Sequence, residues 1–222
     1  MVFLAFKANK QYNFFMGKEI ASKRRLGIMG GTFDPIHYGH LVAAEGARHA
    51  FNLEKVVFIP AGNPPHKPGY IVAEPSVRYK MTCLAIASNP FFCSSAMEVE
   101  RPGPSYTVDT VRKMAHLYPE KRIYFITGAD AILEIFSWKD SQILLTMCNF
   151  VATTRPGYCL KELNKRFDSM PKGVKQNISF MEVPALAISS TDIRQRVHEG
   201  KPIKYLLPEP VEDYILRNNL YR

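Results

Sequence analysis

Two histidines three residues apart follow a glycine-rich turn, and these are the residues of the chain best suited to chemistry. The segment runs Gly30-Gly31-Thr32-Phe33-Asp34-Pro35-Ile36-His37-Tyr38-Gly39-His40. Glycines allow the backbone to approach a ligand closely, and the unpaired N–H groups at a helix start bind phosphate. Near a helix start, residues three apart face the same way. We therefore expect His37 and His40 to stabilise charge during phosphoryl or nucleotidyl transfer.

The same segment has simpler interpretations. Asp34-Pro35 is ordinary turn chemistry, and His-x-x-His is half of a metal site, although no nearby Cys or acidic ligand set completes one. The segment is not a Walker loop, because no Gly-Lys-Ser/Thr follows, and it lacks the G-x-G-x-x-G spacing of dinucleotide-binding folds. We predict a site that binds phosphate and has no protein-held metal.

The elements that must position these residues form a strand–helix–strand unit. An apolar run at 26–29 and another at 55–60 predict buried strands, and 41–51, rich in small residues, predicts the helix between them. Such a βαβ unit predicts a parallel sheet with a right-handed crossover. Further strands are expected at 91–99, 122–127, 149–154 and 178–183, and further helices at 75–88, after 105–107, from 188–194 and at 208–219. The predicted fold class is α/β, a Rossmann-like doubly wound parallel sheet of about six strands with helices on both faces.

Length and charge limit the organisation of the chain. At 222 residues, 46% of them hydrophobic, the chain is expected to form one globular domain over residues 24–222. Residues 1–23 are expected to be a flexible extension, and Met16 is an alternative start. The net charge of +9 is concentrated at this end, because residues 1–25 carry six Lys or Arg against one Glu. The remaining moderate excess suits an anionic nucleotide as well as a polynucleotide.

Cysteine usage and hydropathy point to a cytoplasmic protein. The four cysteines form no C-x-x-C pair and are typical of thiols in a reducing compartment. No apolar run approaches the length of a membrane helix. We expect no nucleic-acid partner and no membrane association, and a homo-oligomer remains open.

Other polar residues stand at strand ends and helix starts, where α/β sheets bind ligands. The expected strand at 122–127 is followed by Gly128 and Asp130. Ser190, Thr191 and Arg194 begin a helix that offers an anion site, although Ser189 with Asp192 is also a capping box. Lys67 lies in a proline-rich loop, and Thr107 or Ser105 is expected to cap a helix. Trp138, the only tryptophan, is either a core anchor or a stacking platform.

Taken in chain order, the glycine-histidine segment, the proline-rich loop, the Gly128 and Trp138 segments and the helix start at Ser190 resemble the bacterial nicotinate-nucleotide adenylyltransferase family. His37-Tyr38-Gly39-His40 matches the (H/T)xGH signature of the nucleotidyltransferase superfamily, and Ile188 to Arg194 matches its ISSTxxR motif. The loop at 64–67, the turn at 103–107 and the Trp138 segment narrow the resemblance to this family. Pantetheine-phosphate adenylyltransferases share the first and last motifs but lack the middle ones.

The resemblance implies transfer of the adenylyl group of ATP to nicotinate mononucleotide, which gives deamido-NAD and pyrophosphate. Mg²⁺ is expected to bind through the substrate phosphates. His37 and His40 would hold the α-phosphate. The implied ATP-binding residues are Gly30, Gly31, Thr32, Phe33, Gly128, Asp130, Ser190, Thr191 and Arg194, and the implied mononucleotide-binding residues are Thr107, Trp138, Lys139 and Lys67. The acidic residues nearest in sequence to Thr107 and to the Trp138 segment are Asp109 and Asp140.

Two other functions stay open at this stage. The first is adenylyl transfer to another phosphate acceptor, such as nicotinamide mononucleotide or phosphopantetheine. The second is a non-catalytic nucleotide- or RNA-binding module that uses the basic N-terminal segment, although basic residues interleaved with aromatics are not evident elsewhere.

Overall fold

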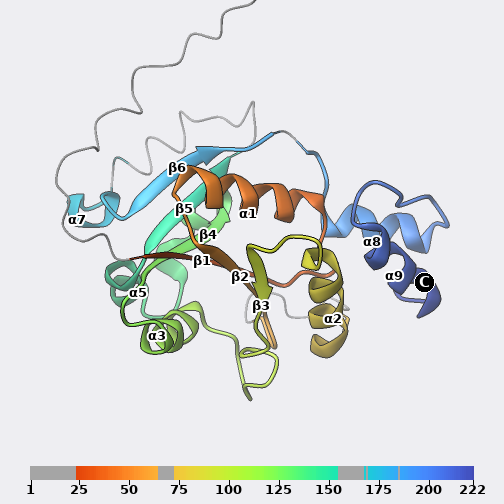
Figure 1. Ribbon diagram of the computed structural model, residues 1–222, viewed down its shortest axis with the longest axis horizontal. Helices are drawn as coiled ribbons and strands as arrows, with labels where there is room; N and C mark the ends of the chain where they lie inside the picture. The colour runs from red at the N-terminus through yellow and green to blue at the C-terminus, as the bar shows by residue number, and fades with distance from the viewer. Residues whose placement is uncertain (1–23, 65–72, 155–167, 169, 185) are drawn as a thin grey trace, which may run out of the picture.

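The structure is a computed structural model that describes residues 24–64, 73–154, 168, 170–184 and 186–222. Its centre is a sheet of six strands in the order β3-β2-β1-β4-β5-β6, and every neighbouring pair is parallel (Figure 1). The strands are β1 (Arg25–Gly31), β2 (Lys55–Pro60), β3 (Phe92–Ser94), β4 (Arg122–Gly128), β5 (Asn149–Thr154) and β6 (Ile178–Glu182). The predicted fold class is confirmed. The expected N-terminal extension, Met16 and Lys67 lie outside the described residues.

One strand is shorter than predicted. The pattern over 91–99 predicted a long strand, but β3 pairs with β2 only from Phe92 to Ser94. Ser95 N–H donates a last bond to the carbonyl of Phe58 at 2.9 Å, and the chain then turns away from this edge of the sheet. The weak alternation beyond Ser94 was therefore wrongly interpreted as strand.

The helices follow the predicted order. They are α1 (Tyr38–Ala50), α2 (Pro75–Ile86), α3 (Thr107–Leu117), α4 (Ala129–Leu133), the 3₁₀ helix η2 (Ile135–Ser137), α5 (Ser141–Met147), α7 (Lys172–Lys175), α8 (Ser190–His198) and α9 (Glu209–Arg217). Helix α1 begins three residues earlier than predicted, with His37 as its N-cap. This start places His40 in the first turn of the helix.

The strands send alternate side chains into two separate cores, as parallel strands covered on both faces must. In β1, Met29 joins the core under α1, α2, α8 and α9, whereas Ile28 joins the core under α3, α4 and α5. Figure 1 shows α1 on one side of the sheet and α3 with α5 on the other. No helix among the described residues is long and apolar enough to cross a membrane.

The sheet order creates a switch point between β1 and β4. From β1 the chain moves outward to β2 and β3, then returns to place β4 on the other side of β1. At such a point the connections leave the sheet in opposite directions and open a crevice outside the carboxyl ends of the strands. The residues that follow β1 and β4 therefore meet at one edge.

Candidate active site

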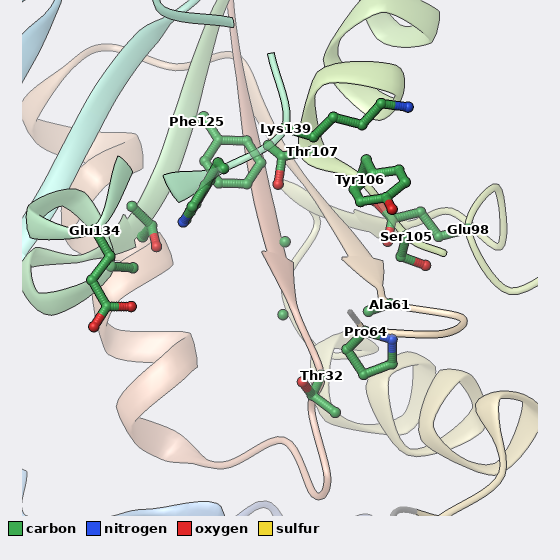
Figure 2. Close-up of a pocket in the computed structure, with 15 residues that line it drawn as sticks. Thr32, Ala61, Pro64, Glu98, Ser105, Tyr106, Thr107, Phe125, Glu134 and Lys139 are labelled. Atoms are coloured by element: carbon green, nitrogen blue, oxygen red, sulfur yellow. The ribbon is translucent and has the colours of Figure 1, made fainter. Parts of the chain in front are cut away.

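Two cavities open at the carboxyl ends of β1 and β4. The first, of about 310 Å³, is lined by the ends of both strands, the turn before α3 and residues between Ala131 and Lys139 (Figure 2). The second, of about 420 Å³, is lined by residues from the start of α1, the start of α4, the end of β5 and the start of α8. The cavities adjoin along β4, because Thr127 lines the first and Gly128 the second.

The two histidines lie together in the second cavity. Their ring centroids are 3.8 Å apart with an interplanar angle of 31°, so the rings stack. The backbone N–H of His37 donates to Nδ1 of His40 at 3.2 Å. In a neutral imidazole that accepts at Nδ1, the proton is on Nε2. His40 is thus oriented to donate a hydrogen bond from Nε2.

Phe33 packs against the ring of His40. Its side chain is 2% exposed, and its ring meets His40 edge-on at a centroid distance of 5.1 Å. A Cβ at Gly31 would lie 2.8 Å from the Phe33 ring, so only glycine fits there. Phe33 itself lines neither of the two cavities.

The other residues predicted to bind ATP do not all lie in the same cavity. Gly128, Asp130 and Ser190 line the second cavity together with the histidines. A Cβ at Gly128 would have no atom within 4 Å, so a ligand has open access to this backbone. Gly30, Gly31 and Thr32 instead line the first cavity. Thr191 and Arg194 line neither of the two.

Helix α8 is attached to the loop that follows β1. Ser189 caps the helix by accepting a bond from the N–H of Asp192 at 3.1 Å, which is one of the two bonds of the predicted capping box. The hydroxyl of Ser190 donates to the carbonyl of Pro35 at 2.9 Å, and Arg194 Nη1 donates to the carbonyl of Asp34 at 2.6 Å. These bonds fix the polar end of α8 beside the histidine segment.

The mononucleotide-binding candidates that the structure describes gather in the first cavity. Thr107, Trp138 and Lys139 all line it. Trp138 is half-buried, and its ring packs edge-on against Phe125 at 6.3 Å. The Lys139 ammonium lies 4.3 Å from the centroid of the Tyr106 ring and 3.8 Å from a carboxylate oxygen of Asp109. The cavity therefore combines a large aromatic ring with a cation.

The predicted cap of α3 is wrong. Its N-cap is Tyr106, which makes no side-chain capping bond. The hydroxyl of Ser105 instead accepts hydrogen bonds from the N–H groups of Gly62, at 2.9 Å, and Asn63, at 3.1 Å. Ser105 thus joins the turn before α3 to the loop after β2, and both segments border the first cavity.

An acidic residue that sequence reasoning missed also lines this cavity. Glu98 is 7% exposed and accepts a hydrogen bond from the hydroxyl of Thr110 at 2.5 Å. Burial raises the pKa of the Glu98 carboxyl, although the hydrogen bond from Thr110 acts in the opposite direction. Figure 2 shows Glu98 beside Ser105 and Tyr106, across the cavity from Glu134. Because Glu98 lies in a turn beyond the end of β3, no sequence pattern indicated its position.

Arg78 is the second residue that the sequence did not reveal. It lies on α2, within the helix expected at 75–88, and it is only 1% exposed. Its guanidinium donates to four backbone carbonyls, those of Thr32, Ala61, Gly62 and Ala73, at 2.5 to 3.0 Å. It therefore holds together the ends of β1 and β2, on which the first cavity is built.

Known proteins resemble the chain over most of its length. Residues 28–196 match the cytidylyltransferase-like family. A protein of Moorella thermoacetica, named probable nicotinate-nucleotide adenylyltransferase, is 59% identical over 199 residues, which cover 89% of this chain and 92% of the relative. A protein of the same name from Desulfitobacterium hafniense strain Y51 is 55% identical and covers 91% and 98%.

Solved structures resemble the fold as well. The nicotinic acid mononucleotide adenylyltransferase of Plasmodium falciparum, complexed with NaAD, superimposes with a TM-score of 0.70 at 22% identity. The match covers 89% of this chain and 97% of that one. At this identity the likeness shows a shared fold.

Proposed function

Because this chain belongs to the cytidylyltransferase-like family and, within it, to the nicotinate-nucleotide adenylyltransferases, we propose that it transfers the adenylyl group of ATP to nicotinate mononucleotide. The observation that carries the proposal is the pair of adjoining cavities at the switch point. One contains the stacked histidines and the start of α8, and the other contains Trp138 and Lys139. ATP occupies the second cavity, which contains the histidines, and the mononucleotide occupies the first cavity, which contains Trp138. Their phosphates then meet at the ends of β1 and β4.

The reaction requires no protein nucleophile. An oxygen of the mononucleotide 5′-phosphate forms a bond to the α-phosphorus of ATP, the bond from this phosphorus to the bridging oxygen breaks, and pyrophosphate leaves. Catalysis then consists of positioning and stabilisation of charge. His37 and His40 hold the α-phosphate, with Nε2 of His40 donating to it. Gly30, Gly31 and Thr32 line the first cavity.

The remaining contacts follow from the lining of each cavity. Gly128 and Asp130 face the ribose or adenine of ATP, and Ser190, with Thr191 and Arg194 behind it, faces the β- and γ-phosphates. In the other cavity Trp138 stacks on the pyridine ring, and Thr107 and Lys139 meet its carboxylate. Lys67, outside the described residues, assists a phosphate. Phe33 contributes by holding His40.

Mg²⁺ fits this arrangement as a companion of the ATP phosphates. The described residues contain no group of three His, Cys, Asp or Glu side chains that would hold a metal by themselves. A cation that prefers oxygen ligands and retains several waters would bind such a site mainly through phosphates, and Asp130 lines the same cavity. When bound, Mg²⁺ neutralises charge on the triphosphate and leaving pyrophosphate.

The acceptor is the acid rather than the amide. The start of α3 borders the first cavity, and a helix start attracts an anion. The ammonium of Lys139 adds to this attraction. Glu98 would oppose it if ionised, but burial favours its neutral form. An amide would leave donors of the site unpaired at a cost of about 1–3 kcal/mol each.

A pyrophosphate-release assay with ATP and a panel of acceptors tests the proposal. We expect a kcat/KM for nicotinate mononucleotide at least about a hundredfold above that for nicotinamide mononucleotide, and no turnover of phosphopantetheine. A preference for the amide would refute the acid assignment and would point to Glu98 as an acceptor for the amide N–H₂. Absence of turnover with every acceptor would refute the enzymatic function.

A further inference from the structure

Asp34, three residues before His37, is a buried carboxylate with partners from distant parts of the chain. The side chain is 4% exposed. Its Oδ1 accepts from the Tyr221 hydroxyl at 2.6 Å and from the N–H of Ala73 at 3.2 Å. Its Oδ2 lies 3.7 Å from Nη1 of Arg194. A carboxylate this deeply buried requires such partners, because an unpaired charge in a protein interior is costly.

Arg194 is held by the backbone carbonyl of Asp34 rather than by its carboxylate. The guanidinium makes its short bond, 2.6 Å, to the backbone carbonyl of Asp34 and only a long contact to the carboxylate. The Tyr221 hydroxyl makes the short bond to that carboxylate instead. Tyr221 therefore satisfies a charge that would otherwise attract the arginine more closely. With Oδ1 bonded to Tyr221, the guanidinium keeps donor groups for a ligand.

Tyr221 adopts a costly backbone conformation at this position. Its φ is +64°, in the left-handed region that aromatic residues rarely occupy. Burial and the charge of Asp34 raise the pKa of its phenol, so the hydroxyl stays a donor at all working pH values. Strain of this kind persists only where surrounding contacts hold it, and it is common near functional sites.

We propose that Tyr221 is a positioning residue for ATP. By bonding Asp34, it keeps the segment from Asp34 to His40 and the guanidinium of Arg194 in the relative position in which both bind the triphosphate. This proposal rests on the proposed adenylyl transfer for the role of Arg194. Loss of the hydroxyl leaves Asp34 to pair with the guanidinium directly and draws it away from the phosphates. A misplacement of about 1 Å in such a constellation is costly for binding and turnover.

The test is Tyr221→Phe, with Tyr214→Phe as its control. Tyr214 lies on α9 and packs against the same core, and its hydroxyl makes no hydrogen bond to another described residue. The readouts are the affinity for an ATP analogue with a methylene bridge between the α- and β-phosphorus atoms, KM for each substrate, and the melting temperature. For Tyr221→Phe we expect analogue affinity about tenfold weaker and KM for ATP raised to match, with KM for the mononucleotide within about twofold.

A double-mutant cycle with Arg194→Met decides whether Tyr221 acts through the arginine. If it does, Tyr221→Phe has no further effect on analogue affinity in the Arg194→Met background. Equal effects in both backgrounds, a parallel rise of both KM values, or an effect no larger than that of Tyr214→Phe would overturn the proposal. Because analogue binding needs no acceptor, it remains decisive even if nicotinate mononucleotide proves not to be the substrate.

Discussion

Replacement of Arg78 tests whether the ends of β1 and β2 are held by a single buried guanidinium. In Arg78→Met the chain keeps a long apolar side chain but loses four hydrogen bonds to backbone carbonyls. A hydrogen bond from a charged donor contributes about 1.5–3 kcal/mol, but burial of the charge opposes folding. Burial also lowers the pKa of Arg78, consistent with that cost. We expect a net loss of about 4 kcal/mol.

Urea unfolding followed by circular dichroism measures this loss. For a domain of this size, about 4 kcal/mol corresponds to a fall of roughly 8–16 °C in melting temperature. Arg78→Lys keeps the charge, but one ammonium with three donors cannot replace the planar fork, so we expect an intermediate loss. The control is Lys80→Met, because Lys80 is exposed on the same helix and should change stability by less than about 0.5 kcal/mol.

The kinetic consequence should follow the same geometry. Arg78 holds the carbonyls of Thr32 and Ala61, and both residues line the first cavity. In the folded fraction of Arg78→Lys, KM for the mononucleotide should therefore rise more than KM for ATP. A loss of stability below about 1 kcal/mol in Arg78→Met would refute the reasoning, because four backbone carbonyls that lose a shared charged donor should together cost more than that.

The remaining predictions concern the two cavities. His40→Ala should lower kcat by at least about a hundredfold with little change in ATP affinity, because the imidazole acts mainly in the transition state. Near-normal turnover of this variant in stopped-flow kinetics would contradict the prediction. Trp138→Ala should raise KM for the mononucleotide roughly tenfold, since stacking contributes about 1–2 kcal/mol, and Trp138→Phe should restore most of it; a rise in both KM values would make Trp138 a core residue. Burial raises the pKa of Glu98, so between its usual and raised pKa the folded state holds a proton that the unfolded state releases. The free energy of unfolding of the wild type therefore falls as the pH rises through that window. Glu98→Gln lacks this titration, so its free energy of unfolding minus that of the wild type should increase over the same window. A difference that stays flat or falls from pH 4 to 8 would show that Glu98 ionises normally.

The sequence by itself determined the architecture and pointed to several residues that line the two cavities. Apolar runs with β-branched residues, separated by helical patterns, are sufficient for a parallel sheet, because strands buried on both faces must be continuously hydrophobic. His37 and His40 were recognisable because a local spacing at a helix start fixes their relative orientation. Trp138 was noticed because it is the single tryptophan, but its choice between core and cavity was not decidable from the sequence.

Only the tertiary structure decided which distant residues meet. Sequence patterns place Glu98 in an expected strand, Arg78 in an expected helix and Tyr221 near the end of the chain, and they give none of the three a role. Each becomes important through contacts made across the sheet, such as the bond from Tyr221 to Asp34, 187 residues earlier. The same holds for Ser105, whose hydroxyl bonds the loop after β2 rather than capping α3. Local patterns describe the period of a helix or strand, but they contain no information on which polar groups a fold buries together, and buried polar groups must find partners wherever the chain brings them.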